Sequence, residues 1–232
     1  MSENTATVCE RIRCDLFALK DEKYADFVST LIPAVERKSI IGVRTPALRK
    51  YARSLSREEA DAFLSALPHV YYEENNLHAY LLSDMRDAER TLSMVEVFLP
   101  YVDNWATCDV MRPKIFKKHT DMIYERIPVW LSSGRTYTVR YAVGMLHYYF
   151  LGDAFSASHL ALTASVCSEE YYVNMMLAWY FAEALVRQRE ATLPYFFERI
   201  IPEPVFSMAC RKAQESYRVS SQDKAALRRL RK

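Results

Sequence analysis

Two side chains that could stabilise a positive charge stand four residues apart in the segment VDNWATCDVM, residues 102–111. At this spacing Trp105 and Asp109 share one face of a helix, which places a flat aromatic surface beside a carboxylate. A ring face and a carboxylate both attract a developing cation. The alternative is structural, because a tryptophan inside a helix is most often part of the core, and an aspartate there can belong to a buried salt bridge.

Two later apolar segments carry further candidates. Arg140 interrupts TYTVRYAVGML, so its guanidinium needs an anion, which can be the Asp109 carboxylate or a phosphate. Trp179 lies in YYVNMMLAWY, and with Tyr172 and Met176 it forms an aromatic stripe of the kind that usually packs in a core.

The charge of the chain is nearly balanced overall but unevenly distributed. The 31 Lys and Arg residues against 29 Asp and Glu give +2, so no global field marks a nucleic-acid or membrane binder. Residues 211–232 hold eight basic and two acidic residues, or +6, which leaves −4 for the first 210 residues. We predict a basic C-terminal helix over about 211–232. A second basic face follows the Trp105 segment, at Lys114, Lys117 and Lys118. Either face can be simply solvated or can contact a polyanion.

Several classes of protein are disfavoured by what the sequence lacks. Its five cysteines form no CxxC pair, and its four glycines build neither GxGxxG nor a Walker loop. No serine triad is recognisable, and no apolar run reaches the roughly 18–20 residues that span a bilayer. We therefore expect no metal, no cofactor, no membrane contact and a soluble protein of a reducing cytoplasm.

Apolar residues recur with a helical period along most of the chain, which predicts twelve to fifteen short helices and no strand. Segments 129–151 and 169–190 are predicted to be two long, well-buried helices. Helix starts are indicated at Thr45-Pro46, at Ser56 with Glu59, at Arg112-Pro113 and at Ser168.

Weak repeats organise these helices. The segments that begin at Tyr137 and Tyr171 align without gaps at a spacing of 34 residues, and the segment from Glu73 is a fainter copy. Such spacing is typical of an α-solenoid, in which helix pairs stack and curve around a concave surface. A four-helix bundle with additional helices is the alternative. No composition break divides the chain, so we predict one domain over residues 1–232.

Together these segments resemble the AlkD family of DNA glycosylases, which are made of HEAT-like helical repeats and excise alkylated purines. The resemblance runs from IIGVRTPALRKYAR (residues 40–53) to the basic end. NWATCD is similar to the family's Trp-x-x-x-Asp element, YTVRYAVGM to the segment with its active-site arginine, and YVNMMLAWYF to the one with its second tryptophan. One position departs from the family pattern: Pro33 stands where the best-studied type has an aromatic residue.

The resemblance implies an all-α solenoid of HEAT-like repeats whose concave cleft binds duplex DNA containing alkylated bases. It implies hydrolysis of the N-glycosidic bond of cationic N3- or N7-alkylpurines, with Asp109, Trp105, Trp179 and Arg140 as catalytic residues. A monomer that acts in the cytoplasm on the nucleoid is expected. The residues expected to contact DNA are basic: Arg44, Lys114, Lys117, Lys118, Arg228 and Arg229. A non-catalytic nucleic-acid-binding module and a protein-binding scaffold remain the alternatives.

Overall fold

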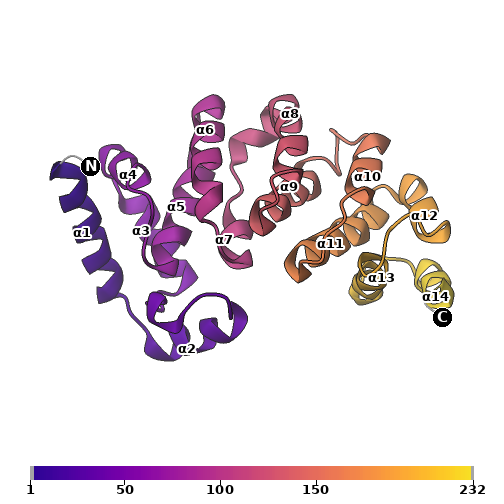
Figure 1. The fold of residues 1–232 in the computed structure, drawn as a ribbon, viewed down its shortest axis with the longest axis horizontal. Helices are drawn as coiled ribbons and strands as arrows, with labels where there is room; N and C mark the ends of the chain where they lie inside the picture. Colours follow the sequence, from indigo (N-terminus) through magenta and orange to yellow (C-terminus); the bar gives the residue numbers. More distant parts are fainter. Residues whose placement is uncertain (1–2, 231–232) are drawn as a thin grey trace. The chain divides into compact units, whose positions relative to one another are not determined.

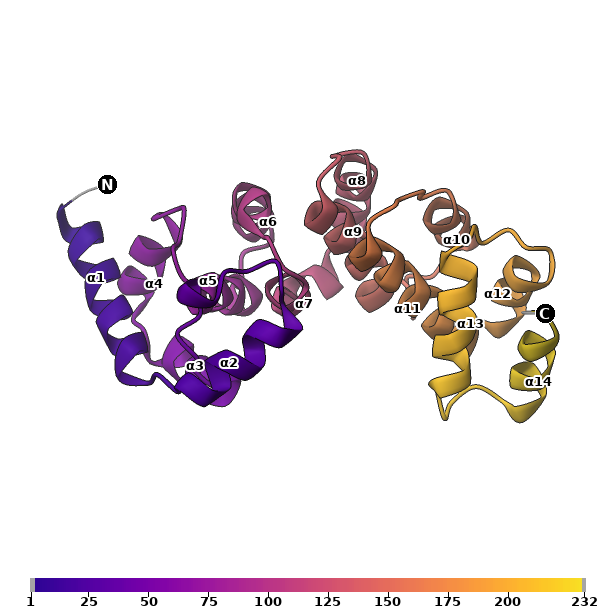
Figure 2. The ribbon, with the colours of Figure 1, turned by 60° about the horizontal axis from the view of Figure 1, so that its bottom comes forward.

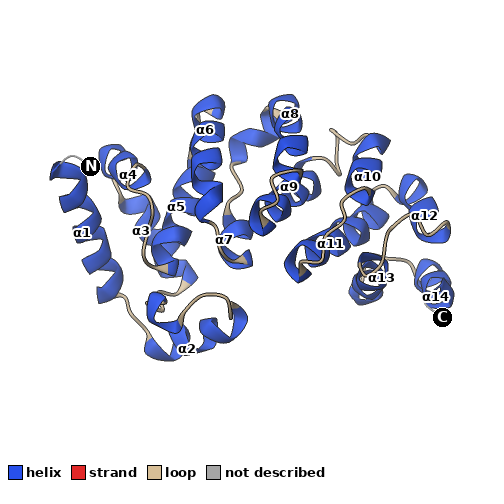
Figure 3. Cartoon of the chain, viewed as in Figure 1, coloured by secondary structure: helices blue, strands red, loops and turns tan. Residues whose placement is uncertain are grey.

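The computed structural model describes residues 3–230, and all regular structure in this range is helical (Figure 1, Figure 3). Fourteen α-helices and three short 3-10 helices occur there, with no strand. The all-helical prediction is therefore confirmed for the described residues. Contacts divide them into two compact units that meet between Lys117 and Lys118. Such a division does not by itself indicate two domains, because in an array of repeats each repeat contacts only its neighbours. The single domain over residues 1–232 therefore stays a prediction.

The first unit is built around helix α5 (Tyr72–Asp84), in which ten of thirteen residues are buried. Helices α3 (Thr45–Ser54), α4 (Arg57–Leu64), α6 (Ala88–Phe98) and α7 (Trp105–Val110) contact it. The remaining elements of this half are α1 (Glu3–Ala18), α2 (Glu22–Leu31) and the 3-10 helices Arg37–Ser39, Leu99–Tyr101 and Lys114–Lys118, the last of which reaches the boundary.

One buried carboxylate at the start of α5 fixes the loop that precedes α3. The Glu73 carboxylate is 1% exposed and accepts hydrogen bonds from the backbone N–H groups of Ile41, Gly42 and Val43, at 2.9, 2.7 and 3.2 Å. A carboxylate at this position also interacts favourably with the helix dipole. The loop carries the GVRTP stretch, so its path is set by one buried side chain.

Gly42 is required in that loop by its backbone conformation and by a close approach. Its φ is +94°, and a Cβ atom there would lie 2.1 Å from the carbonyl oxygen of Asp21. Only glycine adopts this conformation without strain and leaves room for the start of α2.

The second unit centres on the long helix α11 (Tyr171–Arg187), which packs against α9 (Thr136–Tyr149) and α13 (Val205–Glu215) (Figure 2). Helix α9 also packs on its neighbour along the chain, α8 (Thr120–Leu131). The other helices of this unit are α10 (Ala157–Ala164), α12 (Arg189–Phe197) and α14 (Ser221–Leu230). The aligned segments at Tyr137 and Tyr171 thus begin two adjacent helices, α9 and α11.

The prediction of one helix over residues 129–151 was wrong, because a turn separates α8 from α9. Helix α8 ends at Leu131, and the Ser132 hydroxyl donates to the Pro128 carbonyl at 2.8 Å. Gly134 follows with φ +69°, a left-handed conformation that a helix cannot contain. The second predicted helix is confirmed as α11.

The prediction of a single basic C-terminal helix over about 211–232 was also wrong. Arg211 and Lys212 lie on α13, and Arg228 and Arg229 lie on α14. The chain restarts at Ser220, whose hydroxyl accepts from the Asp223 N–H at 3.0 Å, as an N-cap residue does.

Two of the four predicted helix starts are confirmed. Helix α3 begins at Thr45 with its proline in the first turn, and Ser56 and Glu59 form a capping box on α4. The residues after Arg112-Pro113 form only a 3-10 helix, and α11 begins at Tyr171 rather than directly after Ser168. The HEAT-like solenoid itself stays a prediction.

Gly42→Ala is expected to lower the free energy of unfolding by about 2–4 kcal/mol, because the new methyl group meets a backbone oxygen and the required φ is strained. Chemical denaturation of the purified variant measures this. Gly152→Ala is the matched control: a Cβ atom there meets nothing within 4 Å, so a change within about 0.5 kcal/mol is expected. Equal effects at both positions would contradict the account of this loop.

Candidate functional site

Helix α7, which carries Trp105 and Asp109, is held on α5 by a buried polar network. The Asn104 side chain accepts from the Thr107 N–H at 2.9 Å and caps the helix, and its amide donates to the Thr107 hydroxyl at 3.0 Å. That hydroxyl donates in turn to the side-chain oxygen Oδ1 of Asn76 on α5, at 2.8 Å. A six-residue helix gains little stability by itself, so these contacts are what position the two candidate residues.

Trp105 is fixed by its edge and partly covered on its face. Its indole Nε1 donates to the Leu31 carbonyl at 3.0 Å, and the ring packs beside a core cluster that includes Ala25, Val28 and Ile32. The side chain is half-buried rather than enclosed. The indole is therefore both a core contact and a partly open surface, and the orientation of its plane is set by α2.

Asp109 lies on the wall of a pocket of about 430 Å³ in the first unit. The pocket is lined from α3, α5, α7 and the segment that follows α7. Four cationic and two acidic side chains face it: Arg49, Arg53, Arg112 and Lys114, with Asp84 and Asp109. The half-buried carboxylate of Asp109 is thus set in a predominantly cationic surrounding.

In the second unit, Arg140 and Trp179 lie together across α9 and α11. Arg140 is 1% exposed, and its Nη1 donates to the Tyr172 carbonyl. Its guanidinium carbon is 5.7 Å from the centre of the Trp179 ring, within the range of a cation–π contact. The two candidates from separate helices are thus brought side by side, and the half-buried Trp179 is not simply a core residue.

The structure therefore pairs the four candidates two by two. Trp105 and Asp109 lie in the first unit, and Arg140 and Trp179 lie in the second. Convergence of all four on one site stays a prediction.

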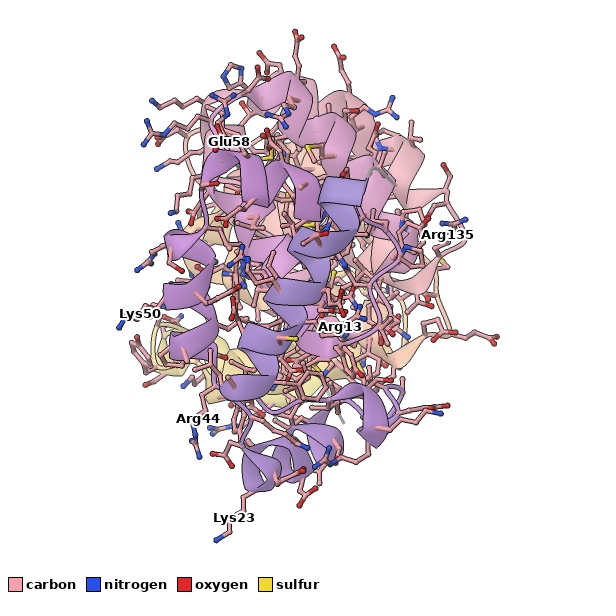
Figure 4. The ribbon with its side chains drawn as sticks, turned by 90° about the vertical axis from the view of Figure 1, so that its left-hand side faces the viewer. Arg13, Lys23, Arg44, Lys50, Glu58 and Arg135 are labelled. Carbon is pink, nitrogen blue, oxygen red and sulfur yellow. The ribbon has the colours of Figure 1, made fainter. Side chains whose placement is uncertain are left out.

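The basic residues expected to contact DNA are exposed, and several have partners. Lys114 is 2.5 Å from Asp84, and Arg44 is 2.8 Å from Asp21, whose pKa is lowered by the Tyr24 N–H and by Arg44 itself. Figure 4 shows Arg44 extending away from the helices of the first unit. The other exposed members of the predicted set are Lys117, Lys118, Arg228 and Arg229, and Arg231 and Lys232 of the basic tail lie outside the described residues.

Sequence reasoning missed the arginines of the Asp109 pocket. Arg49 and Arg53 stand four residues apart in a helix whose start was predicted, and both flank buried positions, Leu48 and Ala52. This spacing was the signal that could have found them. Arg112 was noted only as a helix start.

Within residues 3–230 no helix is long and apolar enough to cross a membrane. In the same range no group of three or more His, Cys, Asp or Glu side chains is arranged to hold a metal ion.

A family model described as DNA alkylation repair enzyme matches residues 12–195, which is more than half of the chain. The chain belongs to this family. The match spans both units and includes Trp105, Asp109, Arg140 and Trp179, so the resemblance drawn from short motifs is confirmed at the level of the family. It supports an enzyme of DNA alkylation repair and contact with DNA. No curated protein matches the chain.

Asn104→Ala is expected to lower the free energy of unfolding by about 2 kcal/mol, because it removes the cap of α7 and leaves the buried Thr107 hydroxyl without a donor. Thermal or chemical denaturation measures the loss. Asn104→Ser, which keeps an oxygen acceptor at the cap, should lose less. If the alanine variant is as stable as the wild type, the network does not position α7.

Proposed function

We propose that this protein is a DNA glycosylase of the AlkD type that hydrolyses the N-glycosidic bond of cationic N3- or N7-alkylated purines in duplex DNA. The observation that carries the proposal is the placement of Asp109, a carboxylate on the wall of a cationic pocket in a chain of the DNA alkylation repair family. Cations attract the DNA backbone, and the Asp109 carboxylate can face the reacting sugar.

The chemistry needs few groups. An alkylpurine that already carries a positive charge leaves the sugar without a general acid. What remains is to stabilise an oxocarbenium-like sugar and to position a water molecule. Asp109 supplies the negative charge and orients the water.

The two tryptophans supply electron-rich ring faces for the same cation. Trp105 is held in place by its bond to Leu31, and Trp179 is held against the Arg140 guanidinium. Arg140 is assigned to the phosphate that flanks the lesion. These roles follow from the motif match and from the contacts of each side chain.

The proposed enzyme has no lyase activity. A lyase needs an unprotonated amine as a nucleophile. The lysine that lines the Asp109 pocket, Lys114, is engaged in an ion pair with Asp84 at 2.5 Å, so its Nζ is directed at that carboxylate. Borohydride should therefore trap no covalent complex with damaged DNA.

The proposed architecture is a HEAT-like solenoid that acts as a monomer, with the four candidates on its concave face. Packing of α8 on α9, α9 on α11, and α11 on α13 supports it, since each helix contacts near neighbours in the sequence.

Asp109→Asn is expected to reduce excision of 7-methylguanine and 3-methyladenine from methylated duplex DNA by about 10²–10³-fold, because it removes the charge that stabilises the transition state. Single-turnover release of the free bases measures this. The melting temperature should change by no more than about 2 °C, because the side chain lies at a pocket wall.

The control is Asp153→Asn, the same change on an exposed aspartate that does not line this pocket; it should excise like the wild type. A purely structural Asp109 predicts the reverse: a loss of about 3–5 kcal/mol of stability with excision retained while the variant is folded. That pattern would indicate that Trp105 and Asp109 have a structural role only.

Duplex binding by the wild type is expected to weaken steeply with salt, by roughly 0.9 log unit per contacted phosphate per decade of salt concentration. Fluorescence anisotropy with an undamaged duplex measures the slope. A slope near zero would favour a protein-binding scaffold, and a steep slope without any base release would favour a non-catalytic DNA-binding module.

A further inference from the structure

An arginine pair on α3 faces the same pocket as Asp109. Arg49 and Arg53 are one helical turn apart, so their guanidinium groups lie on one face of the helix. Both are exposed, and each follows a buried residue, Leu48 or Ala52. The pair thus stands at the edge of the core, where the backbone of α3 is anchored but the charged ends reach the pocket.

The Arg49 guanidinium is held in place by an aromatic ring. Its central carbon lies 5.1 Å from the centre of the Tyr80 ring on α5, and Tyr80 is 7% exposed. A guanidinium over a ring keeps its N–H edge available for an anion, and its planar fork matches phosphate oxygens. Within residues 3–230 neither Arg49 nor Arg53 forms an ion pair, so their charge is not cancelled by a protein carboxylate.

The charge balance of the pocket favours an anionic ligand. Arg49, Arg53, Arg112 and Lys114 face it against two carboxylates, and one of these, Asp84, is paired with Lys114. An anion bound between the arginines would lie in the same 430 Å³ space as the Asp109 carboxylate.

These arginines are more accessible to a phosphate than Arg140. Arg140 is 1% exposed and donates to a backbone carbonyl, whereas Arg49 and Arg53 are exposed at the surface.

We propose that Arg49 and Arg53 bind a phosphodiester group of duplex DNA in this pocket and thereby place the adjoining sugar against Asp109. They are positioning residues, which act on the reaction through the location of the sugar. The inference rests on the proposed function for the reaction, but the phosphate contact can be tested without it.

The test is a scan with single neutral phosphates. A set of duplexes carries one 7-methylguanine, fluorinated at the sugar 2′ position so that it resists cleavage, and one methylphosphonate at a different position in each. The dissociation constant of each duplex is measured for the wild type and for the double variant Arg49→Gln/Arg53→Gln.

For the wild type, one or two positions near the lesion should raise the dissociation constant about ten- to hundredfold when neutralised, because a charge-assisted contact is lost. The double variant should bind the unmodified duplex more weakly by a similar factor and show no further loss at those positions. Its single-turnover excision at saturating protein should also fall, which distinguishes positioning of the sugar from affinity alone.

The control is Lys50→Gln, on the same helix but outside the pocket lining; Figure 4 shows Lys50 pointing away from the protein. It should retain the wild-type pattern of phosphate effects. Arg49→Lys/Arg53→Lys, which keeps the charge, should recover part of the affinity. A melting temperature for each variant confirms folding.

The proposal is overturned if the double variant keeps the position-dependent losses, or if no single phosphate matters to the wild type, as expected for a pocket that takes a free anion. If the wild type releases no base but the phosphate effect disappears in the double variant, the glycosylase proposal fails and the phosphate site stands. If base release is normal in the double variant and the phosphate effect persists, the glycosylase proposal stands and the phosphate site at Arg49 and Arg53 fails.

Discussion

The first unit depends on the buried polar side chains of one helix, α5. The Glu73 carboxylate accepts three backbone N–H groups of the loop before α3, and Asn76 accepts from Thr107 and so holds α7. Farther along the same helix, Tyr80 lies under the Arg49 guanidinium. A buried polar group that lost its partner would cost about 1–3 kcal/mol, so each contact fixes one element at one position. The pocket that contains Asp109 is the result, since its walls come from the elements that α5 holds.

Two opposite electrostatic needs meet in this pocket. DNA binding calls for positive charge, and an oxocarbenium-like sugar calls for negative charge. In the proposed function the Asp109 carboxylate among cations serves both, because the two acidic side chains of the pocket do not outweigh its four basic ones. Removal of the carboxylate should leave affinity for the DNA backbone almost unchanged, which separates binding from chemistry.

The sequence predicted the helical class, the long helix α11, the starts of α3 and α4, and the family, because period, capping residues and short motifs are local signals. It did not predict the break at Gly134, because apolar segments of helical period lie on both sides, although Ser132 and Ser133 before Gly134 are a local turn signal. Nor did it predict the role of Glu73, whose hydrogen bonds join residues about thirty positions apart. The pocket arginines were missed for a related reason: Arg49 and Arg53 face a pocket only once α5 and α7 are placed beside α3.

The most direct test of the central claim compares binding of two duplexes that differ only in the charge of one sugar. One contains a cationic aza-sugar at an abasic position, and the other contains neutral tetrahydrofuran at the same place. Since the phosphates are identical, the ratio of the two dissociation constants isolates the interaction with the sugar charge. The wild type should prefer the cationic duplex by at least about tenfold, and Asp109→Asn should bind both alike. An equal preference in both proteins, or none in the wild type, would contradict the assignment of Asp109 to the developing cation.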